Sequence, residues 1–398
     1  MQVARLLFAC MCATTYALSQ SHADATSSPR EVRESNSVDL SKYGFGAVTY
    51  LPNSALRYDA ATILESSDPN THLLFDSDKS LVVYRIVHAG GSDAVMILEL
   101  DVTHPTSLKQ ARFTIASRRS RDELIDGEGI ISTRQDGSMA VVADRTIHIL
   151  TSSLQETSKC VIPDSYIGNS VISIQAYGST SKLLLRATTL TSHISSFSLL
   201  DTNSCHIESA PISSQLPGSV WTVWSIGRYL VFRDGAGWTR ISTSGNSVAR
   251  ESLFSGYQSV NQTIAAANSS SLAMNMNSSA KIKVWNMDDT TDYGIEMNMG
   301  VPATPPGAMN ACSPGSAGLS DQGRVFASEF VCTRDTLPAK ACGSRGRSFI
   351  NIYDVYKHRV SECIPINLVN GDFSLSISPN GRHLAVFNGG KLQLYELE

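Results

Sequence analysis

Two short apolar runs joined by a few turn-forming residues recur seven times along the chain. The first runs of the seven pairs begin at Ser80, Ser138, Ser181, Arg228, Ser271, Arg324 and Arg382. Beyond residue 43, no long window places apolar residues at helical spacing, whereas runs rich in β-branched and aromatic residues are repeatedly bounded by Gly, Asn, Asp and Ser. The sequence therefore predicts an all-β chain.

The spacing of these pairs constrains how the strands are arranged. The pairs lie about 50 residues apart, which is typical of the blades of a β-propeller. Polar turns such as Asp136-Gly137 and Pro379-Asn380-Gly381 precede several of the first runs, and a further short run lies before the turn. We therefore expect seven four-stranded antiparallel blades, each of which buries its apolar faces against its neighbours.

The end of the second run often carries an aromatic residue or Leu followed by Asp, Asn or Glu. These dipeptides are Leu100-Asp101, Leu200-Asp201, Trp285-Asn286, Tyr353-Asp354 and Tyr395-Glu396. Because of these dipeptides, the chain resembles the WD40 and YVTN-type β-propeller repeats, in which such a dipeptide closes the third strand of a blade. The Gly-His pair that begins a standard WD40 repeat is missing, so the resemblance implies the fold without the usual Asp–His–Ser–Trp hydrogen-bond network.

The two ends of the chain suggest how such a ring closes. The last repeat supplies only three strands, and an isolated run, Phe45–Leu51, lies near the N-terminus. We expect this run to form the outer strand of the last blade, because that pairing removes two exposed sheet edges. An open seventh blade is the alternative. Residues 43–398 are thus predicted to form a single β-propeller domain.

The first 42 residues are expected to lie outside this domain. Residues 1–25 contain Arg5, a short apolar segment and the small-residue motif Ala23-Asp24-Ala25, which together are typical of a secretory signal peptide. Residues 26–42 are polar and lack periodicity, which predicts a disordered leader. No later apolar run approaches the roughly 20 residues that cross a bilayer, so we expect a secreted or periplasmic protein without a membrane span.

Composition narrows the classes of function. The formal net charge is −4, and this excludes a strongly basic nucleic-acid-binding protein. Seven repeats of about 50 residues use most of the chain that remains after residues 1–25 are removed, and they leave no room for a second catalytic domain. No G-x-S-x-G motif is present, and the nearest match, Gly315-Ser316-Ala317-Gly318, lies in a loop rich in Pro and Gly.

Metal and cofactor sites find little support in the sequence. The acidic segments 122–128 and 288–292 are read as solvated turns, with a Ca²⁺ site as the alternative, because neither has the spacing of a calcium loop. We expect no metal and no cofactor. The histidines are dispersed, so a propeller-type hydrolase or lactonase would need residues from several blades to meet at the mouth of the central channel. That enzyme remains the alternative to a binding protein.

Six cysteines remain once Cys10 and Cys12 are removed with the signal peptide, and none belongs to a C-x-x-C pair. Four of them surround two long loops of the sixth repeat, where we predict the bridges Cys332–Cys342 and Cys312–Cys363, one of three possible pairings. Cys160 and Cys205 are assigned to outer strands of neighbouring blades. We expect them to be too far apart for a bridge, and therefore free and buried.

Two groups of residues are candidates for binding. Trp221 and Trp224 fall on the expected innermost strand of the fourth blade, where their spacing directs them to opposite faces and one is a candidate to face a ligand. The second group is basic and lies in the long loop 333–347. It consists of Arg334, Lys340, Arg345 and Arg347.

Long loops on one face of a rigid fold often carry binding sites, although this one could also be an insertion without a partner. The sequence thus predicts a monomeric scaffold that binds a protein or a cell-surface polymer.

Overall fold

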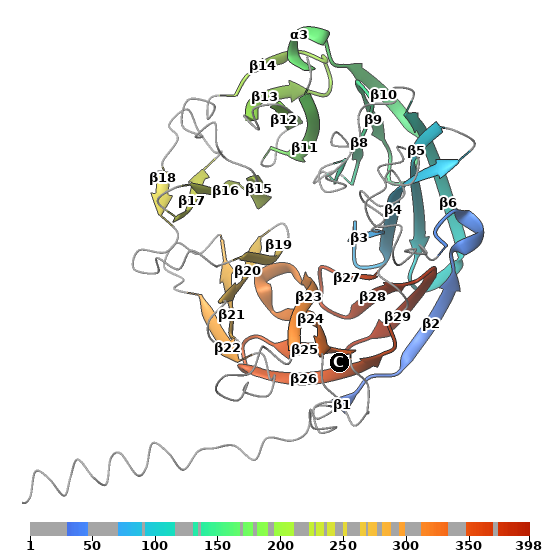
Figure 1. The fold of residues 1–398 in the computed structure, drawn as a ribbon, viewed down its shortest axis with the longest axis vertical. Coiled ribbons are helices and arrows are strands. Elements are labelled where there is room, and N and C mark those ends of the chain that lie inside the picture. The colour runs from blue at the N-terminus through green and yellow to red at the C-terminus, as the bar shows by residue number, and fades with distance from the viewer. Residues whose placement is uncertain are drawn as a thin grey trace, which may run out of the picture.

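Strands dominate the computed structural model (Figure 1). It describes residues 30–46 and, between residues 71 and 398, all but a series of connections, the longest of which are 116–129, 211–222, 253–262, 299–311 and 333–347. Within these residues the strands form seven sheets, numbered here in chain order, and every sheet is built mainly from consecutive strands. Figure 1 shows the sheets arranged radially, and the strands nearest the centre in their sheets include β3, β11, β15, β19, β23 and β27.

The first three sheets follow one another without rearrangement. The first contains β3 (His72–Phe75), β4 (Ser80–Ala89), β5 (Ser92–Asp101) and β6 (His104–Ile115). The second contains β7 (Ile131–Thr133), β8 (Met139–Ala143), β9 (Thr146–Leu150) and β10 (Glu156–Val161). After the short helix α3 (Asp164–Ile167), the third contains β11 (Ser170–Ala176), β12 (Lys182–Thr189), β13 (Ser195–Asp201) and β14 (Ile207–Ser209).

The later sheets keep this order. The fourth contains β15 (Val223–Ile226), β16 (Tyr229–Asp234), β17 (Gly237–Ser242) and β18 (Arg250–Ser252). The fifth contains β19 (Thr263–Ala267), β20 (Ser271–Met276), β21 (Lys281–Asn286) and β22 (Ile295–Asn298). The sixth contains β23 (Cys312–Leu319), β24 (Val325–Cys332), β25 (Ser348–Asp354) and β26 (Arg359–Ile366), with the 3-10 turn η3 (Asp321–Gly323) after β23. The seventh contains β27 (Phe373–Ile377), β28 (His383–Asn388) and β29 (Lys391–Glu396).

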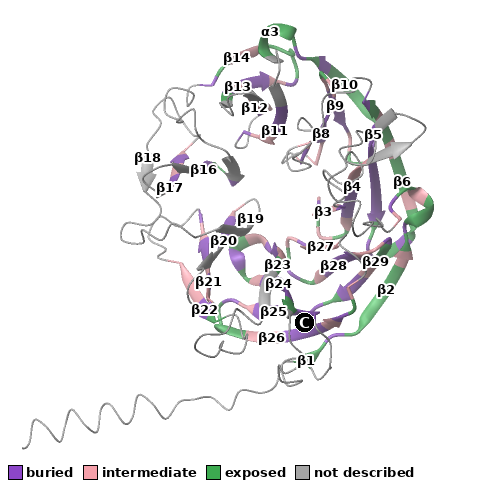
Figure 2. Cartoon of the chain, viewed as in Figure 1, coloured by how far each residue is buried: buried purple, intermediate pink, exposed green. Residues whose placement is uncertain are grey.

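The prediction of an all-β chain with four-stranded antiparallel sheets is confirmed. Apolar clusters lie between neighbouring sheets: one joins Ile147 and Cys160 of the second sheet to Ile174 and Leu183 of the third. Figure 2 shows the outermost strands β6 and β10 as largely exposed, while buried residues line the strands inside them. Each sheet therefore hides its faces against the next, as the repeat length requires.

From residue 30 onward, the N-terminal segment forms strands and is not the disordered leader predicted for residues 26–42. β2 (Glu34–Asp39) pairs antiparallel with β29, and β1 (Arg30–Glu31) pairs parallel with β26 as a fifth strand of the sixth sheet. We call residues 30–45 the N-terminal arm. The outer strand of the seventh sheet is therefore β2 rather than the predicted run Phe45–Leu51, of which residues 47–51 lie outside the described residues.

Apolar anchors explain why this polar arm is ordered. Leu40 and Phe45 are fully buried in a cluster formed by the first and seventh sheets, and Val32 is buried between the sixth and seventh. Burying each side chain contributes about 1.5–3 kcal/mol, so the anchors hold strand β2 although its own residues are mostly exposed. Arg30 adds ion pairs to Glu398 and, at 3.9 Å, to Glu362.

The recurring dipeptide has a structural role. In Leu100-Asp101, Leu200-Asp201 and Tyr353-Asp354, the Asp carboxylate accepts backbone N–H groups of the turn that follows the third strand. The next residue, for example Val102 or Val355, is buried and donates its N–H to the carbonyl before the second strand. The acidic residue thus shapes the turn, and the apolar one fixes the turn to the sheet.

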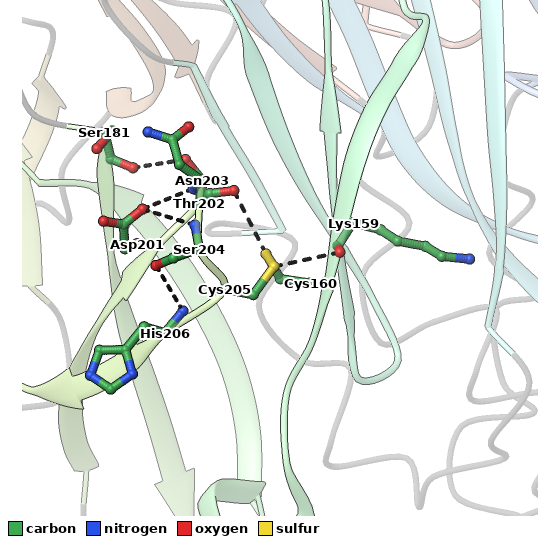
Figure 3. Close-up of a disulfide and its surroundings, with 9 residues drawn as sticks. All are labelled: Lys159, Cys160, Ser181, Asp201, Thr202, Asn203, Ser204, Cys205 and His206. Atoms are coloured by element: carbon green, nitrogen blue, oxygen red, sulfur yellow. Dashed lines mark hydrogen bonds between the residues drawn. A yellow bond between two sulfur atoms is a disulfide. The ribbon is translucent and has the colours of Figure 1, made fainter.

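Cys160 and Cys205 form a disulfide, so the expectation that they are free is wrong (Figure 3). Their Cα atoms are 5.3 Å apart. Cys205 does not lie on an outer strand; it lies in the turn between β13 and β14, which Asp201 shapes through hydrogen bonds from Asn203 and Ser204. This turn reaches the outer strand β10 of the preceding sheet, and the bond therefore joins the second and third sheets.

Candidate interaction surface

The turns between first and second strands, and those between third and fourth strands, emerge on one side of the sheets. We call this side the turn face and define it by residues 76–79, 102–103, 320–324, 355–358 and 378–382. It is the side opposite the ends at which second strands finish and third strands begin, such as Cys332 of β24 and Ser348 of β25. Its turns are short and well defined by hydrogen bonds.

Hydrogen bonds donated by backbone N–H groups join the turns of neighbouring sheets on this face. The N–H of Gln322 donates to Ser270 Oγ at 2.9 Å, and the N–H of Asp321 donates to the Pro379 carbonyl at 2.9 Å. The N–H of Asn380 donates to Asp78 Oδ1 at 2.8 Å. These bonds link the fifth sheet to the sixth, the sixth to the seventh, and the seventh to the first, so the turns hold fixed positions relative to one another.

Two glycines permit this close approach. Gly323 and Gly381 have φ of +65° and +75°, a conformation that favours glycine. A Cβ atom on Gly323 would lie 2.8 Å from Val284 Cγ1, and one on Gly381 would lie 2.8 Å from Val325 Cγ2. Each turn can therefore pack directly on the preceding sheet only because the side chain is absent.

Tyr356 is the most prominent apolar side chain of the turn face. It lies in the turn between β25 and β26 and is 56% exposed. Its hydroxyl donates to the Gln322 carbonyl at 3.4 Å, and exposed Lys357, His358 and Arg359 follow it. His358 Nδ1 lies 3.2 Å from the Glu296 carbonyl, which fixes the turn against the fifth sheet.

Of the positive charges that follow Tyr356 in the chain, that of Lys357 is paired within the turn and that of Arg359 is exposed. Burial acts to raise the pKa of Asp354, but hydrogen bonds from Lys357 and the positive charges of Lys357 and Arg324 outweigh it, and the pKa is lowered. Lys357 Nζ is 2.7 Å from Asp354 Oδ2, so this lysine is neutralised within the turn. Arg359 makes no ion pair with any described residue and leaves its charge exposed.

An exposed tyrosine beside arginine is suited to binding a protein. Tyr and Arg are enriched among the residues that carry most of the binding free energy at protein interfaces. Of the four exposed large hydrophobic residues that the structure describes, which are Val161, Tyr166, Val331 and Tyr356, only Tyr356 belongs to the turn face. Within the described part of the chain, no three His, Cys, Asp or Glu side chains are grouped to hold a metal ion.

The residues predicted from the sequence to bind a ligand lie mostly outside the described residues. Trp224 is on β15, opposite Val231 of β16, and its side chain is not described; Trp221 lies outside altogether. The loop that contains Arg334, Lys340, Arg345 and Arg347 is also not among the described residues. The structure therefore tests neither group, and both stay predictions.

The cysteines of the sixth sheet are partly described. Cys312 and Cys332 are opposite each other on β23 and β24, and Cys363 is disulfide-bonded. Cys342 lies outside the described residues, so the pairs Cys332–Cys342 and Cys312–Cys363 also stay predictions.

Tyr356 was not among the residues singled out from the sequence, although a signal for it exists. The turn after Tyr353-Asp354-Val355 is expected to be polar, and an aromatic residue at its tip has no neighbouring strand to cover it.

In the described residues, no helix is long and apolar enough to span a membrane.

Comparison with known proteins identifies the fold. The WD40 domain of Pan2 from Neurospora crassa is 11% identical, with a TM-score of 0.51 over 92% of this chain and 97% of that one. A chain of the mitotic checkpoint complex is 10% identical over 95% and 96% of the two chains with a TM-score of 0.48, and the Dos1 propeller is 12% identical over 82% and 76% with a TM-score of 0.44. No family model and no curated protein matches the sequence. The first likeness confirms a divergent WD40-like propeller fold.

Proposed function

We propose that this chain is a secreted or periplasmic scaffold, a closed seven-bladed propeller that binds a partner protein through the turn face. The observation that carries the proposal is the exposed Tyr356, three residues before the exposed Arg359, on turns that are hydrogen-bonded from sheet to sheet. A rigid surface loses little conformational entropy on binding, so the free energy of the contacts is retained as affinity.

Several contacts support a closed ring of seven blades. The arm strand β2 lies on β29, and Phe75 and Leu98 of the first sheet share an apolar cluster with Phe387 of the seventh. The hydrogen bond from Asn380 to Asp78 spans the same junction on the turn face. With seven sheets in the described residues, these contacts leave the first and last sheets adjacent.

Secretion rests on two independent features. Residues 1–25 have the charge, apolar segment and small residues of a signal peptide. The disulfide Cys160–Cys205 needs an oxidising compartment to form and persist. The periplasm and the extracellular space both meet that requirement. No observation in the described residues favours the alternative hydrolase or lactonase.

Affinity capture tests the proposal. Tagged residues 26–398 are used to capture proteins from the native envelope or medium, with Tyr356→Ala and Tyr166→Ala as variants. Tyr166 is a matched control, because it is 41% exposed and its hydroxyl also makes one 3.4 Å hydrogen bond to a carbonyl. We expect a protein that wild type and Tyr166→Ala retain and Tyr356→Ala loses.

The capture experiment has clear contrary outcomes. Equal retention by Tyr356→Ala would reject the turn face as the binding surface. Capture of a polysaccharide without protein would reject the class of partner. Thermal melting of all three proteins confirms that a loss of binding is not a loss of folding.

A further inference from the structure

Four sheets present a basic residue at the same position of their first turn. The residue directly before the second strand is Lys79, Arg228, Arg324 or Arg382 in the first, fourth, sixth and seventh sheets. All four are exposed. In the other three sheets this residue is serine, namely Ser138, Ser181 and Ser270, and in none of the seven is it acidic.

Hydrogen bonding shows that the position is equivalent between sheets. The carbonyl of Lys79 accepts the N–H of Val102 at 2.8 Å, and that of Arg324 accepts the N–H of Val355 at 3.0 Å. The carbonyl of Arg382 accepts the N–H of Leu397 at 2.7 Å. The backbone is thus fixed to the end of the third strand in each sheet, and the basic side chain is left at the turn face.

Three of these cations lie on three consecutive sheets, and we call these three the row. Arg324, Arg382 and Lys79 belong to the sixth, seventh and first sheets, whose turns are joined by the hydrogen bonds from Asp321 to Pro379 and from Asn380 to Asp78. Their spacing is therefore set by the fold. Arg359 and Tyr356 border the row at the sixth sheet.

Most acidic residues of the same face accept hydrogen bonds or form an ion pair, and Arg324 itself is one of the charges that act on Asp354. Asp354 binds Lys357 and a backbone N–H, and Asp101 accepts the N–H and hydroxyl of Thr103. Asp78 accepts the N–H of Asn380. Asp76 and Asp321 are partly exposed, and Glu396 is exposed, so the row is flanked by some negative charge.

We propose that the row Arg324, Arg382 and Lys79 binds an acidic, extended polypeptide segment of the partner protein. The inference rests on the proposed function and specifies the chemistry of the partner. A few cations at fixed spacing suit a short run of carboxylates, and Tyr356 supplies an uncharged contact beside it. A nucleic acid fits less well, because its densely charged backbone is bound by larger sets of cations and the chain carries a net charge of −4.

The direct test uses a fluorescent peptide in which Glu alternates with Ser. Its binding to residues 26–398 is followed by fluorescence anisotropy at low and at physiological salt. We expect binding that weakens with salt, and a loss of affinity of at least about tenfold in the double variant Arg324→Glu, Arg382→Glu.

The matched control reverses two exposed cations elsewhere. Arg112 lies on β6 opposite Met96 and Lys159 lies on β10 opposite His148, so Arg112→Glu with Lys159→Glu changes the net charge equally and leaves the turn face intact. This control is expected to bind the peptide as wild type does. Equal weakening in both double variants would overturn the proposal, as would no binding by wild type. An oligonucleotide of equal charge that binds more tightly than the peptide would also overturn it.

The two proposals fail in different ways. Capture of the native partner is repeated with Arg324→Glu, Arg382→Glu beside Tyr356→Ala. A partner that is lost only with Tyr356→Ala supports the scaffold function and overturns the acidic segment. A partner that is retained by both variants overturns the scaffold function and the acidic segment together. A partner that is lost by both variants supports the two proposals.

Discussion

Two junctions between sheets are braced by different means. The second and third sheets are joined by the disulfide Cys160–Cys205 in addition to their apolar cluster. The seventh sheet is held against the sixth and first by the N-terminal arm, which uses strand pairing, buried anchors and ion pairs. A covalent link thus works through two residues at one point, whereas the arm distributes its contacts over three sheets.

The difference shows what each brace requires. The disulfide needs an oxidant and a turn that brings Cys205 to β10, and it then limits the freedom of the unfolded chain. The arm needs no redox chemistry, but its bonds form only when both ends of the chain are folded together. Four measurements sharpen this contrast.

Removal of the arm has the largest expected effect. Deleting residues 26–40 removes the outer strand of the seventh sheet and the buried side chains of Val32 and Leu40. We expect the free energy of unfolding to fall by about 5 kcal/mol or more, as measured by urea denaturation. Deleting only residues 26–29, which precede β1, is the control and is expected to change little. A midpoint that is the same in the two deletions would contradict the role of the arm.

Loss of the disulfide ranks second. The two cysteines are 45 residues apart, and replacing both by serine is expected to cost about 3–4 kcal/mol of unfolding free energy through the greater entropy of the unfolded chain. The measurement is urea denaturation of the double variant without reductant. Adding reductant to this variant then reports on the remaining disulfides, that of Cys363 among them. A double variant as stable as wild type would show that the junction needs no covalent brace.

A single anchor of the arm gives a smaller change. Val32 is 5% exposed between the sixth and seventh sheets, and Val32→Ala is expected to cost about 2 kcal/mol by leaving a cavity. Thermal and urea denaturation measure the effect. Ser37→Ala, at an exposed position of β2, is the control and is expected to stay within about 0.5 kcal/mol of wild type. If the two variants are equally stable, Val32 is not an anchor.

The smallest expected effect is a dependence on pH at the junction of the sixth and seventh sheets. Burial raises the pKa of Glu329, although the N–H of Ser316 donates to its carboxylate and opposes the shift. The folded state thus keeps this carboxyl protonated to a higher pH than the unfolded state does. The contribution of Glu329 to the free energy of unfolding is therefore greatest below the ordinary pKa of a glutamate, and it falls as the pH rises through the raised pKa.

Glu329→Gln tests this expectation because it keeps an oxygen for the Ser316 N–H without the charge. The melting temperature of wild type is expected to fall relative to the variant as pH rises from about 4 to about 8. Parallel curves for the two proteins would reject the assignment. Glu362, whose pKa burial also raises, remains in both proteins as a common background.

The repeating part of the fold was predictable because each repeat carries its own signals. Apolar runs of strand length, turn glycines and the dipeptide ending in Asp or Asn mark local structure directly in the residues. The arm was not predictable in this way. β2 is ESNSVD, a polar segment whose strand conformation comes from its pairing with β29 and from anchors that flank it.

The disulfide and the candidate site could not be predicted from the sequence, because both depend on the geometry of turns. Cys205 has a φ of +56° in the turn after Asp201, and this local geometry, which the sequence does not display, decides that it meets Cys160. The basic residues before the second strands are visible in the sequence. Their alignment on one face became evident only from the shared hydrogen bond to the third strand.

The pairing of β2 with β29 has a consequence for biosynthesis. Glu34 leaves the ribosome more than 350 residues before its partner Tyr395, so the strand made first must wait for the strand made last. Contacts of such high sequence separation form slowly, and an unpaired edge in the meantime invites aggregation. Protection by a chaperone would shield this edge until the final strand arrives.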